Sequence, residues 1–129
     1  MVEVLDPPDM VTRKISRSVT DAESGPGAVR YEPHAKPGVA NLLELLGLAT
    51  GRSPAEVAVG YPEGRYGPLK ADTAAAVVEM LRPIQERFGE LTADPGVVEK
   101  ALAQGAEKAK AVASVTLARA RHAMGLVPR

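Results

Sequence analysis

The sequence contains no cysteine and no tryptophan, and Phe88 is the single phenylalanine among its 129 residues. Without thiols the chain has no disulfide, no zinc site with thiolate ligands and no cysteine nucleophile. With so few aromatic side chains, the core has to come from Leu, Val, Ile, Met and Ala, which favours closely packed helices over sheets. A hydrophobic content of 45% in a chain of this length is enough for one compact domain.

Long apolar runs and a net charge are also missing. No stretch approaches the roughly 20 residues that a membrane span needs, and the N-terminus lacks the basic and then apolar pattern of a signal peptide, so we expect a cytoplasmic protein. Sixteen basic residues balance sixteen acidic ones, so a contact with nucleic acid has to come from a local cluster of cations. Residues 126–129, Leu-Val-Pro-Arg, match a thrombin-cleavage remnant as well as a natural end, and no function is inferred from them.

Proline, glycine and apolar periodicity predict an all-α fold, a single compact bundle of five to six helices over residues 1–129. Pro8 suits the first position of a helix that runs to about Ser18. Gly51 is expected to end a second helix in the left-handed conformation, and Ser53 and Glu56 form a capping box for the third. The later helices are expected at 39–49, 54–60, 68–91, 95–104 and 106–124, with a long irregular loop near residues 19–38.

Apolar spacing also predicts which faces are buried. The helix at 39–49 is apolar almost all round, which is typical of a buried helix, and Val19 is expected to face the core at the end of the first helix. Pro83 lies inside the long helix, where it costs about 3 kcal/mol unless packing compensates, so we expect a kink. Gly105 is expected to separate the last two helices. The predicted core stripe of the long helix is Leu69, Thr73, Ala76, Met80, Ile84, Phe88 and Leu91.

Four segments carry a resemblance to a known family: VTDAESGPGAVRYEPHAKPGVANLL (19–43), GYPEGRYGPLKAD (60–72), RPIQERF (82–88) and QGAEKAKAVA (104–113). Together they resemble the C-terminal part of bacterial tryptophanyl-tRNA synthetases, from just after the signature loop of the ATP site to the end of the chain. The resemblance covers nearly all residues. Where the family usually has Thr-Asp-Ser, this chain has Thr20, Asp21 and Ala22, and it carries an insertion around residues 24–27.

The resemblance implies a helical, anticodon-reading and tRNA-binding domain. Full-length members of the family use ATP to activate tryptophan and transfer it to the cognate tRNA. The sequence lacks the His-Ile-Gly-His-type and Lys-Met-Ser-Lys-Ser-type motifs that handle ATP, so for this chain alone we expect no catalytic residue, no cofactor, no metal and no aminoacylation. The expected partners are tryptophan-specific tRNA and the catalytic domain of the parent synthetase, with self-association through exposed apolar surface.

The first group of candidate tRNA contacts lies on the first helix. Arg13, Lys14 and Arg17 are close to one face, since residues three and four apart are neighbours on a helix, and cations there neutralise phosphates. The alternative is an ordinary solvated face, which charge patterns alone favour. Because the resemblance places this helix directly after the ATP-site loop of the family, we weigh the two interpretations equally.

The second group lies at a glycine-flanked turn. Arg65, Tyr66 and Lys70 put an aromatic ring between cations, which is a usable platform for an unstacked RNA base. The alternative is that Tyr66 packs inward, and the sequence does not separate the two.

Other polar residues have structural explanations. Thr20, Asp21 and Glu23 stand among glycines and prolines, where such side chains more often bond their own backbone than bind ligands. The run at residues 36–43, KPGVANLL, is expected to dock the buried helix. His34 and His122 have no carboxylate pattern that suggests a metal site, so both are expected to be surface histidines.

Two functions from different classes stay open. The first is the tRNA-binding helical part of a tryptophanyl-tRNA synthetase, and in this case the region could also serve mainly to stabilise the parent enzyme. The alternative is a stand-alone truncated paralogue, a protein-interaction module that does not bind tRNA. Salt-dependent binding to tryptophan tRNA distinguishes them.

Overall fold

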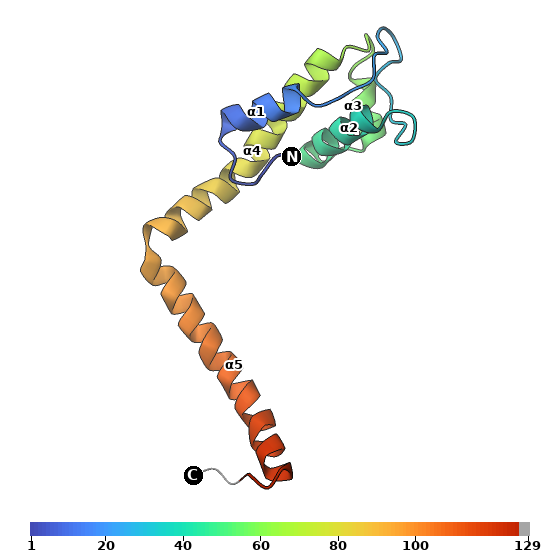
Figure 1. The fold of residues 1–129 in the computed structure, drawn as a ribbon. Coiled ribbons are helices and arrows are strands. Elements are labelled where there is room, and N and C mark those ends of the chain that lie inside the picture. Colours follow the sequence, from blue (N-terminus) through green and yellow to red (C-terminus); the bar gives the residue numbers. More distant parts are fainter. Residues whose placement is uncertain (127–129) are drawn as a thin grey trace. The chain divides into compact units, whose positions relative to one another are not determined.

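The computed structural model describes residues 1–126, and five helices account for most of them (Figure 1). Their bounds are Pro8–Ser16 (α1), Pro37–Thr50 (α2), Pro54–Val59 (α3), Tyr66–Ala93 (α4) and Pro95–Ala123 (α5). Residues 1–126 contain no strand, so the predicted all-α fold of five to six helices is confirmed. Residues 127–129, three of the four positions of the suspected thrombin remnant, lie outside the described residues. None of the described helices is long and apolar enough to pass through a membrane.

Internal contacts divide the chain into two compact units, Met1–Glu86 and Arg87–Arg129. The first unit contains α1, α2, α3 and most of α4, together with the whole buried hydrophobic cluster. In the second unit, α5 has no buried residue. Hydrophobic burial therefore stabilises mainly the first unit. The side chains at the centre of its core are Val11, Val39, Leu42, Leu43, Val57 and Leu69.

The predicted helix ends in the first unit follow from local chemistry. Pro8 occupies the first turn of α1, as expected. Gly51 has a φ of 69° at the end of α2, the left-handed conformation that glycine adopts without a steric cost. At the start of α3, the backbone N–H of Ser53 donates to the Glu56 carboxylate at 2.8 Å and the N–H of Glu56 donates to the Ser53 hydroxyl at 3.3 Å. The capping box is confirmed.

Two predictions about burial in the first unit are wrong. Val19 is 86% exposed, because α1 ends at Ser16 and the helical spacing that would turn Val19 toward the core does not continue. The helix α2 is not buried all round. Leu42, Leu43 and Leu46 are buried, but Leu48 is 73% exposed, so only one side of α2 faces the core.

The two long helices also differ from the prediction. Leu69 and Thr73 of α4 are buried, but Ile84 and Phe88 are about half exposed, at 50% and 49%, so the apolar stripe continues beyond the core that it helps to form. The helix α4 runs through Pro83 without ending. The predicted break at Gly105 is wrong, because α5 is continuous there and a single glycine costs a helix only about 1 kcal/mol.

Candidate nucleic-acid interface

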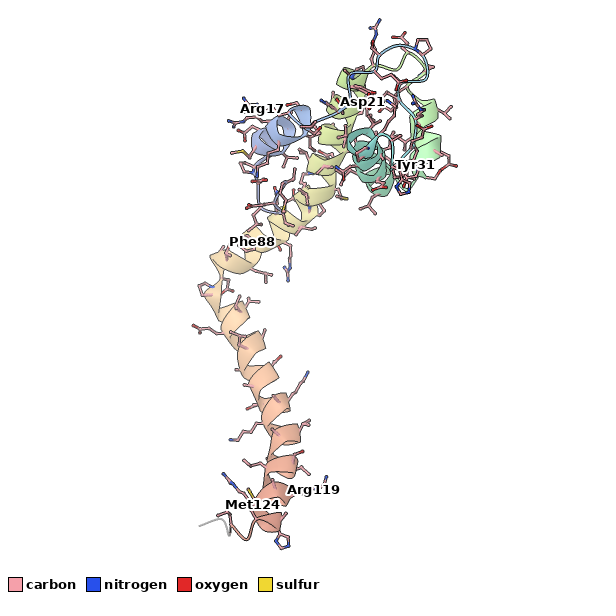
Figure 2. The ribbon with its side chains drawn as sticks, turned by 45° about the vertical axis from the view of Figure 1, so that its right-hand side comes forward. Arg17, Asp21, Tyr31, Phe88, Arg119 and Met124 are labelled. Atoms are coloured by element: carbon pink, nitrogen blue, oxygen red, sulfur yellow. The ribbon has the colours of Figure 1, made fainter. Side chains whose placement is uncertain are left out.

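The cations of α1 differ in how far their head groups are available. Lys14 donates to the Asp6 carboxylate at 2.6 Å, in a pair whose acidic side chain is only 11% exposed. Arg13 lies 3.4 Å from Asp9 in a solvent-exposed pair, which is worth little. Arg17 lies at the C-terminal end of α1 (Figure 2) and is exposed, and its side chain forms no ion pair with any of residues 1–126. The exposed guanidinium groups of Arg13 and Arg17 are therefore the accessible part of this cluster.

A groove of about 650 Å³ runs beside Arg13, between α1 and α4. Its lining is mixed, because Ala75 and Val78 are apolar while Asp9 and Glu79 are acidic. The acidic groups repel a phosphate, so the groove itself does not fit RNA. The residues along it are Pro8, Asp9, Thr12, Arg13, Ser16, Ala75, Val78 and Glu79.

The second group of candidates is partly used within the fold. The Nζ of Lys70 donates to the backbone carbonyl of Ser18 at 2.8 Å, which satisfies a free carbonyl just after α1. Tyr66 is half-buried, and its hydroxyl donates to Asp21 Oδ1 at 2.6 Å. Arg65 remains exposed beside Glu63, at 3.1 Å. The geometry favours the inward-packing interpretation of Tyr66, and RNA contact at these three residues stays a prediction.

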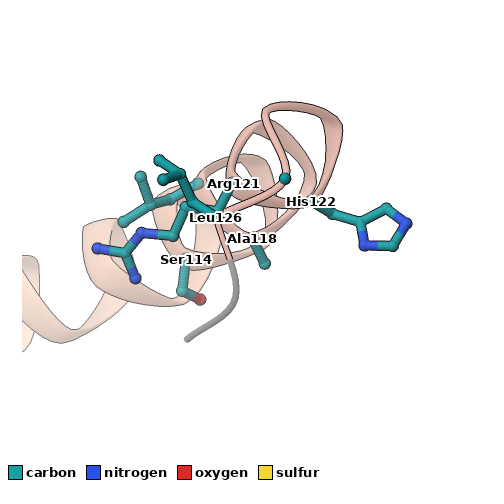
Figure 3. Close-up of a pocket in the computed structure, with 7 residues that line it drawn as sticks. Ser114, Ala118, Arg121, His122 and Leu126 are labelled. Carbon is teal, nitrogen blue, oxygen red and sulfur yellow. The ribbon is translucent and has the colours of Figure 1, made fainter. Parts of the chain in front are cut away.

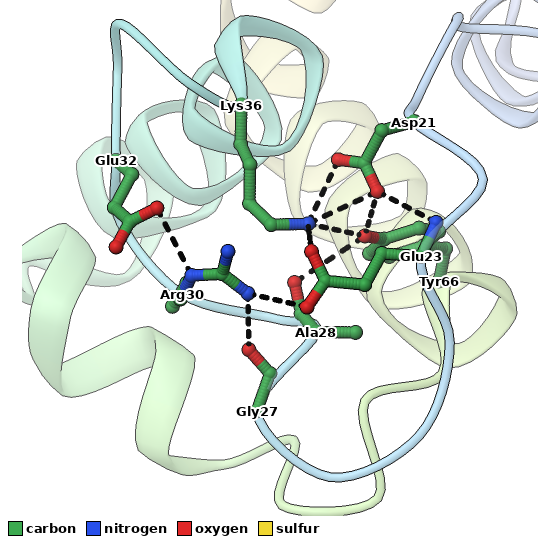
Figure 4. Close-up of polar contacts among 8 residues, drawn as sticks. All are labelled: Asp21, Glu23, Gly27, Ala28, Arg30, Glu32, Lys36 and Tyr66. Atoms are coloured by element: carbon green, nitrogen blue, oxygen red, sulfur yellow. Dashed lines mark hydrogen bonds and ion pairs between the residues drawn. The ribbon is translucent and has the colours of Figure 1, made fainter.

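Lys36 is the centre of a polar network that joins the loop after α1 to the start of α4 (Figure 4). Its side chain is 3% exposed. The ammonium lies 2.9 Å from an oxygen of Asp21 and 2.8 Å from an oxygen of Glu23, and it donates to the Tyr66 hydroxyl at 2.9 Å. It also lies 5.6 Å from the centre of the Tyr66 ring, a cation–π distance. All donor positions of the buried lysine are used.

Arg30 extends the network along the loop. Its guanidinium donates to Glu23 at 2.6 Å and to the carbonyl of Gly27 at 2.9 Å, and it lies 3.0 Å from Glu32 (Figure 4). Glu23 is thus shared between Arg30 and Lys36. These bonds join Arg30 to residues before and after it in the same loop, and so they order a segment that has no helical or strand pattern.

The pKa values of these groups follow from the contacts. Hydrogen bonds from the Tyr66 hydroxyl and the Lys36 ammonium hold the pKa of Asp21 well below its usual value. Hydrogen bonds from Arg30 and, to a smaller extent, from Lys36 lower the pKa of Glu23. Burial alone would lower the pKa of Lys36, but its hydrogen bonds to Glu23, Tyr66 and Asp21 outweigh that cost and raise it. At neutral pH the two carboxylates and the ammonium are therefore charged, whereas the Tyr66 hydroxyl, whose pKa is raised, is neutral.

Two glycines permit backbones to approach closely around the network. A Cβ at Gly38, the second residue of α2, would fall onto the carbonyl oxygen of Val19, so α2 begins directly against the segment that follows α1. Gly64 has a φ of 64° and its missing side chain leaves room for the carbonyl of Gly25. The long loop is thus packed against α2 and against the turn before α4. The expectation that Asp21 and Glu23 are structural residues agrees with this arrangement.

A hollow of about 520 Å³ lies on α5 in the second unit (Figure 3). Ser114 and His122 both line it, but Ser114 donates to its own helix at the Ala111 carbonyl and His122 points away (Figure 3). A nucleophile and its base have to lie within hydrogen-bond reach, so this pair has no catalytic geometry. Within residues 1–126, no three His, Asp or Glu residues are grouped as metal ligands.

The sequence analysis did not predict that the side chains of Lys36 and Arg30 form the hydrogen bonds that order the loop. The partners of Lys36 are 13, 15 and 30 positions away in sequence, and no local pattern relates such positions. The signal that was present is chemical. A lysine directly before Pro37 and Gly38, at the start of a helix with one buried side, needs an anionic partner if its ammonium is buried, because an unpaired buried charge is costly.

Comparisons with known proteins relate the chain to one group of enzymes. It is 53% identical over 128 residues to tryptophan–tRNA ligase 1 of Streptomyces coelicolor and 40% identical over 129 residues to the tryptophan–tRNA ligase of Mycobacterium leprae. These matches include 99% and 100% of this chain but only 37% of each relative. The chain corresponds to the C-terminal region of these ligases. No family model matches the sequence.

A solved structure agrees with this relation at the level of the fold. The crystal structure of tryptophanyl-tRNA synthetase from Mycoplasma pneumoniae matches with a TM-score of 0.74 over 98% of this chain and 38% of the neighbour. The sequence identity in that match is 24%. The helical fold of the chain is therefore one that also occurs within a tryptophanyl-tRNA synthetase.

Proposed function

Because the chain is homologous to the C-terminal region of tryptophan–tRNA ligases, we propose that it is the helical tRNA-binding part of such a ligase. The observation that carries the proposal is the 53% identity to the Streptomyces coelicolor enzyme across 99% of the chain. The relatives are named for a reaction on tRNA, and the chain spans about 37% of their length. Activation of tryptophan with ATP is assigned in this proposal to the part of the ligase that the chain does not span.

We place the tRNA contact on the exposed arginines of the first unit. Arg13 and Arg17 are four positions apart, about one helical turn, so their guanidinium groups can reach neighbouring phosphates of one strand. Arginine is suited to this role because its planar fork donates two parallel hydrogen bonds to phosphate oxygens. The balanced charge of the whole chain gives no general attraction to RNA, so these local groups have to supply it.

The partner proposed for the second unit is the remaining part of the ligase. Val98, Leu102, Ala109, Ala113 and Ala120 share one side of α5, because they are spaced by four and seven residues. All five side chains are apolar, and that of Leu102 is 68% exposed. An apolar side of this length is normally covered by protein. The ligases extend well beyond the matched region, which supports the proposal that the rest of the ligase covers this side.

The tRNA contact is tested by titrating the chain with tryptophan tRNA at several salt concentrations. Each phosphate contact contributes about 0.9 to the slope of log affinity against log salt, so Arg17→Gln should weaken binding and lower the slope by about one. Arg82→Gln is the matched control, because Arg82 is an exposed arginine on α4 that pairs with Glu79. Equal effects of the two substitutions on tRNA affinity would contradict the proposed site. Absence of tRNA binding at low salt would contradict the proposed function.

Catalysis is tested separately by pyrophosphate exchange. We expect no tryptophan-dependent exchange above background with the purified chain. Exchange that rises with the concentration of the chain would contradict the assignment of ATP chemistry to the rest of the ligase.

The stand-alone interaction module remains the second candidate, and the exposed uncharged side of α5 is the observation that favours it. It predicts partner binding without affinity for tRNA. Absence of tRNA binding at low salt, together with association through α5, would favour it over the first proposal.

A further inference from the structure

The buried ammonium of Lys36 occupies the point where three parts of the first unit meet. Lys36 lies directly before α2, Asp21 and Glu23 belong to the loop after α1, and Tyr66 begins α4. A fully buried lysine is rare unless it is paired. Lys36 is 3% exposed and is bonded to two carboxylates and one hydroxyl within 3.0 Å.

We infer that Lys36 is a positioning residue for RNA binding, which holds Arg17 at the end of α1 in the orientation and electrostatic surroundings that phosphate contact requires. The inference rests on the proposed tRNA-binding function. Lys36 touches no RNA in this mechanism, because its ammonium is enclosed by protein.

The first argument is geometric. The segment after Arg17 is held at three residues by contacts from α4, from α2 and from Lys36 directly before α2. The carbonyl of Ser18 accepts a hydrogen bond from Lys70 of α4, the carbonyl of Val19 packs against Gly38 of α2, and the carboxylate of Asp21 accepts from Lys36 and Tyr66. Of these anchors, Lys36 is the only one that carries a buried charge among residues 1–126. Loss of its charge leaves Asp21 bonded to the Tyr66 hydroxyl of α4 but without its buried cation, which weakens the far anchor of the segment that follows Arg17.

The second argument is electrostatic. Asp21 and Glu23 follow Arg17 by four and six positions, and both side chains are partly exposed, at 32% and 46%. Two uncompensated carboxylates in the segment that follows Arg17 would make the local potential less favourable for a phosphate. Lys36 pairs with both carboxylates, and Arg30 shares Glu23, so both acids of the loop after α1 have cationic partners. Placement and charge compensation therefore come from the same ammonium group.

A double-mutant cycle with tRNA as the ligand tests the inference. Lys36→Met keeps the length of the side chain and removes the charge, and Arg17→Gln removes the proposed phosphate contact. Residues coupled in one network show interaction free energies large enough to change binding about fivefold. We expect Lys36→Met to weaken tRNA binding about fivefold in the wild-type chain and less than about twofold in Arg17→Gln. A general loss of structure would instead weaken binding by the same factor in both backgrounds, which would overturn the inference.

Folding of the variants is followed in the same samples by circular dichroism. If Lys36→Met does not fold, the cycle is run in a chain that also carries Asp21→Asn and Glu23→Gln, where no carboxylate is left uncompensated. The neutral variant also separates the two arguments. Weak binding that no longer responds to Arg17→Gln supports positioning by Lys36, whereas binding at the wild-type level overturns it.

The cycle distinguishes failure of the inference from failure of the proposed function. If the wild-type chain does not bind tRNA at low salt, both the inference about Lys36 and the proposed function are wrong. A wild-type chain that binds tRNA, with additive effects of Lys36→Met and Arg17→Gln, leaves the tRNA-binding function in place and removes only the role of Lys36. Arg30→Met is the control for ion-pair loss, because Arg30 bonds Glu23 but not Asp21, which is the nearer of the two acids to Arg17 in sequence.

Discussion

Replacing Gly38 with alanine tests how tightly the start of α2 packs against the segment after α1. Alanine is favoured over glycine inside a helix by about 0.5–1 kcal/mol, so helix propensity alone predicts a more stable protein. In the structure the new Cβ falls onto the carbonyl oxygen of Val19, and a backbone atom cannot turn away as a flexible side chain can. Propensity and packing therefore predict opposite signs for Gly38→Ala.

The magnitude follows from what must move. Relief of the overlap requires a shift of the segment around Val19, which is bonded on one side through Ser18 to Lys70 at 2.8 Å and on the other through Asp21 to Lys36 at 2.9 Å. Overpacking costs about 1–3 kcal/mol, and each weakened hydrogen bond adds about 1 kcal/mol. With both hydrogen bonds weakened and the gain in propensity subtracted, we expect a net decrease of about 2–4.5 kcal/mol in the free energy of unfolding.

Urea unfolding followed by tyrosine fluorescence measures this change where it occurs. The chain has no tryptophan, and its three tyrosines, Tyr31, Tyr61 and Tyr66, all lie in the first unit, so the signal does not depend on α5. Asn41→Ala is the control, because Asn41 is exposed on the same helix and its replacement should stabilise by a few tenths of a kcal/mol. Equal stabilisation by Gly38→Ala and Asn41→Ala would refute the packing argument.

Three further predictions concern the core, the acid range and the second unit. Leu43→Ala removes a side chain with no exposure and should cost about 2–5 kcal/mol in urea unfolding, whereas Leu48→Ala, at a position 73% exposed, should cost no more than about 0.5 kcal/mol. The lowered pKa of Asp21 means that its carboxylate stabilises the fold above pH 3.8 and loses this effect as the pH falls toward the folded-state value. Asp21→Asn should therefore lower the free energy of unfolding at neutral pH and weaken its dependence on pH below 3.8. An unchanged pH dependence in urea unfolding would contradict this. In sedimentation velocity, Ala109→Glu should reduce self-association through the uncharged side of α5, and Ala111→Glu on the opposite side should not; equal effects would remove that surface from the proposal.

The start of α1, the end of α2 and the start of α3 could be predicted because each is decided by residues within one turn, whereas the predicted helix end at Gly105 was wrong. Pro8 suits the first turn through its own fixed φ, the N–H of Gly51 donates to the Gly47 carbonyl, and Ser53 and Glu56 form the capping box, all as expected. Burial was harder to predict because periodicity shows that a helix has an apolar side but not what covers it. Phe88 continues the spacing that buries Leu69, yet it is half exposed because the buried cluster of the first unit ends at Leu81.

The candidate interface was harder still, because a cation in sequence does not show whether its head group is used within the fold. Lys14 and Lys70 were equal in pattern to the arginines, but each ammonium has an internal acceptor within 2.8 Å. Arg13 and Arg65 also have an acidic neighbour, but a guanidinium has five N–H donors and retains several after one contact. Lys14 and Lys70 are only partly exposed, and their ammonium groups are held at Asp6 and at the Ser18 carbonyl, so they are less available to a phosphate than the exposed arginines. The salt slope of tRNA binding should therefore fall on replacement of the exposed arginines and change little on replacement of the two lysines.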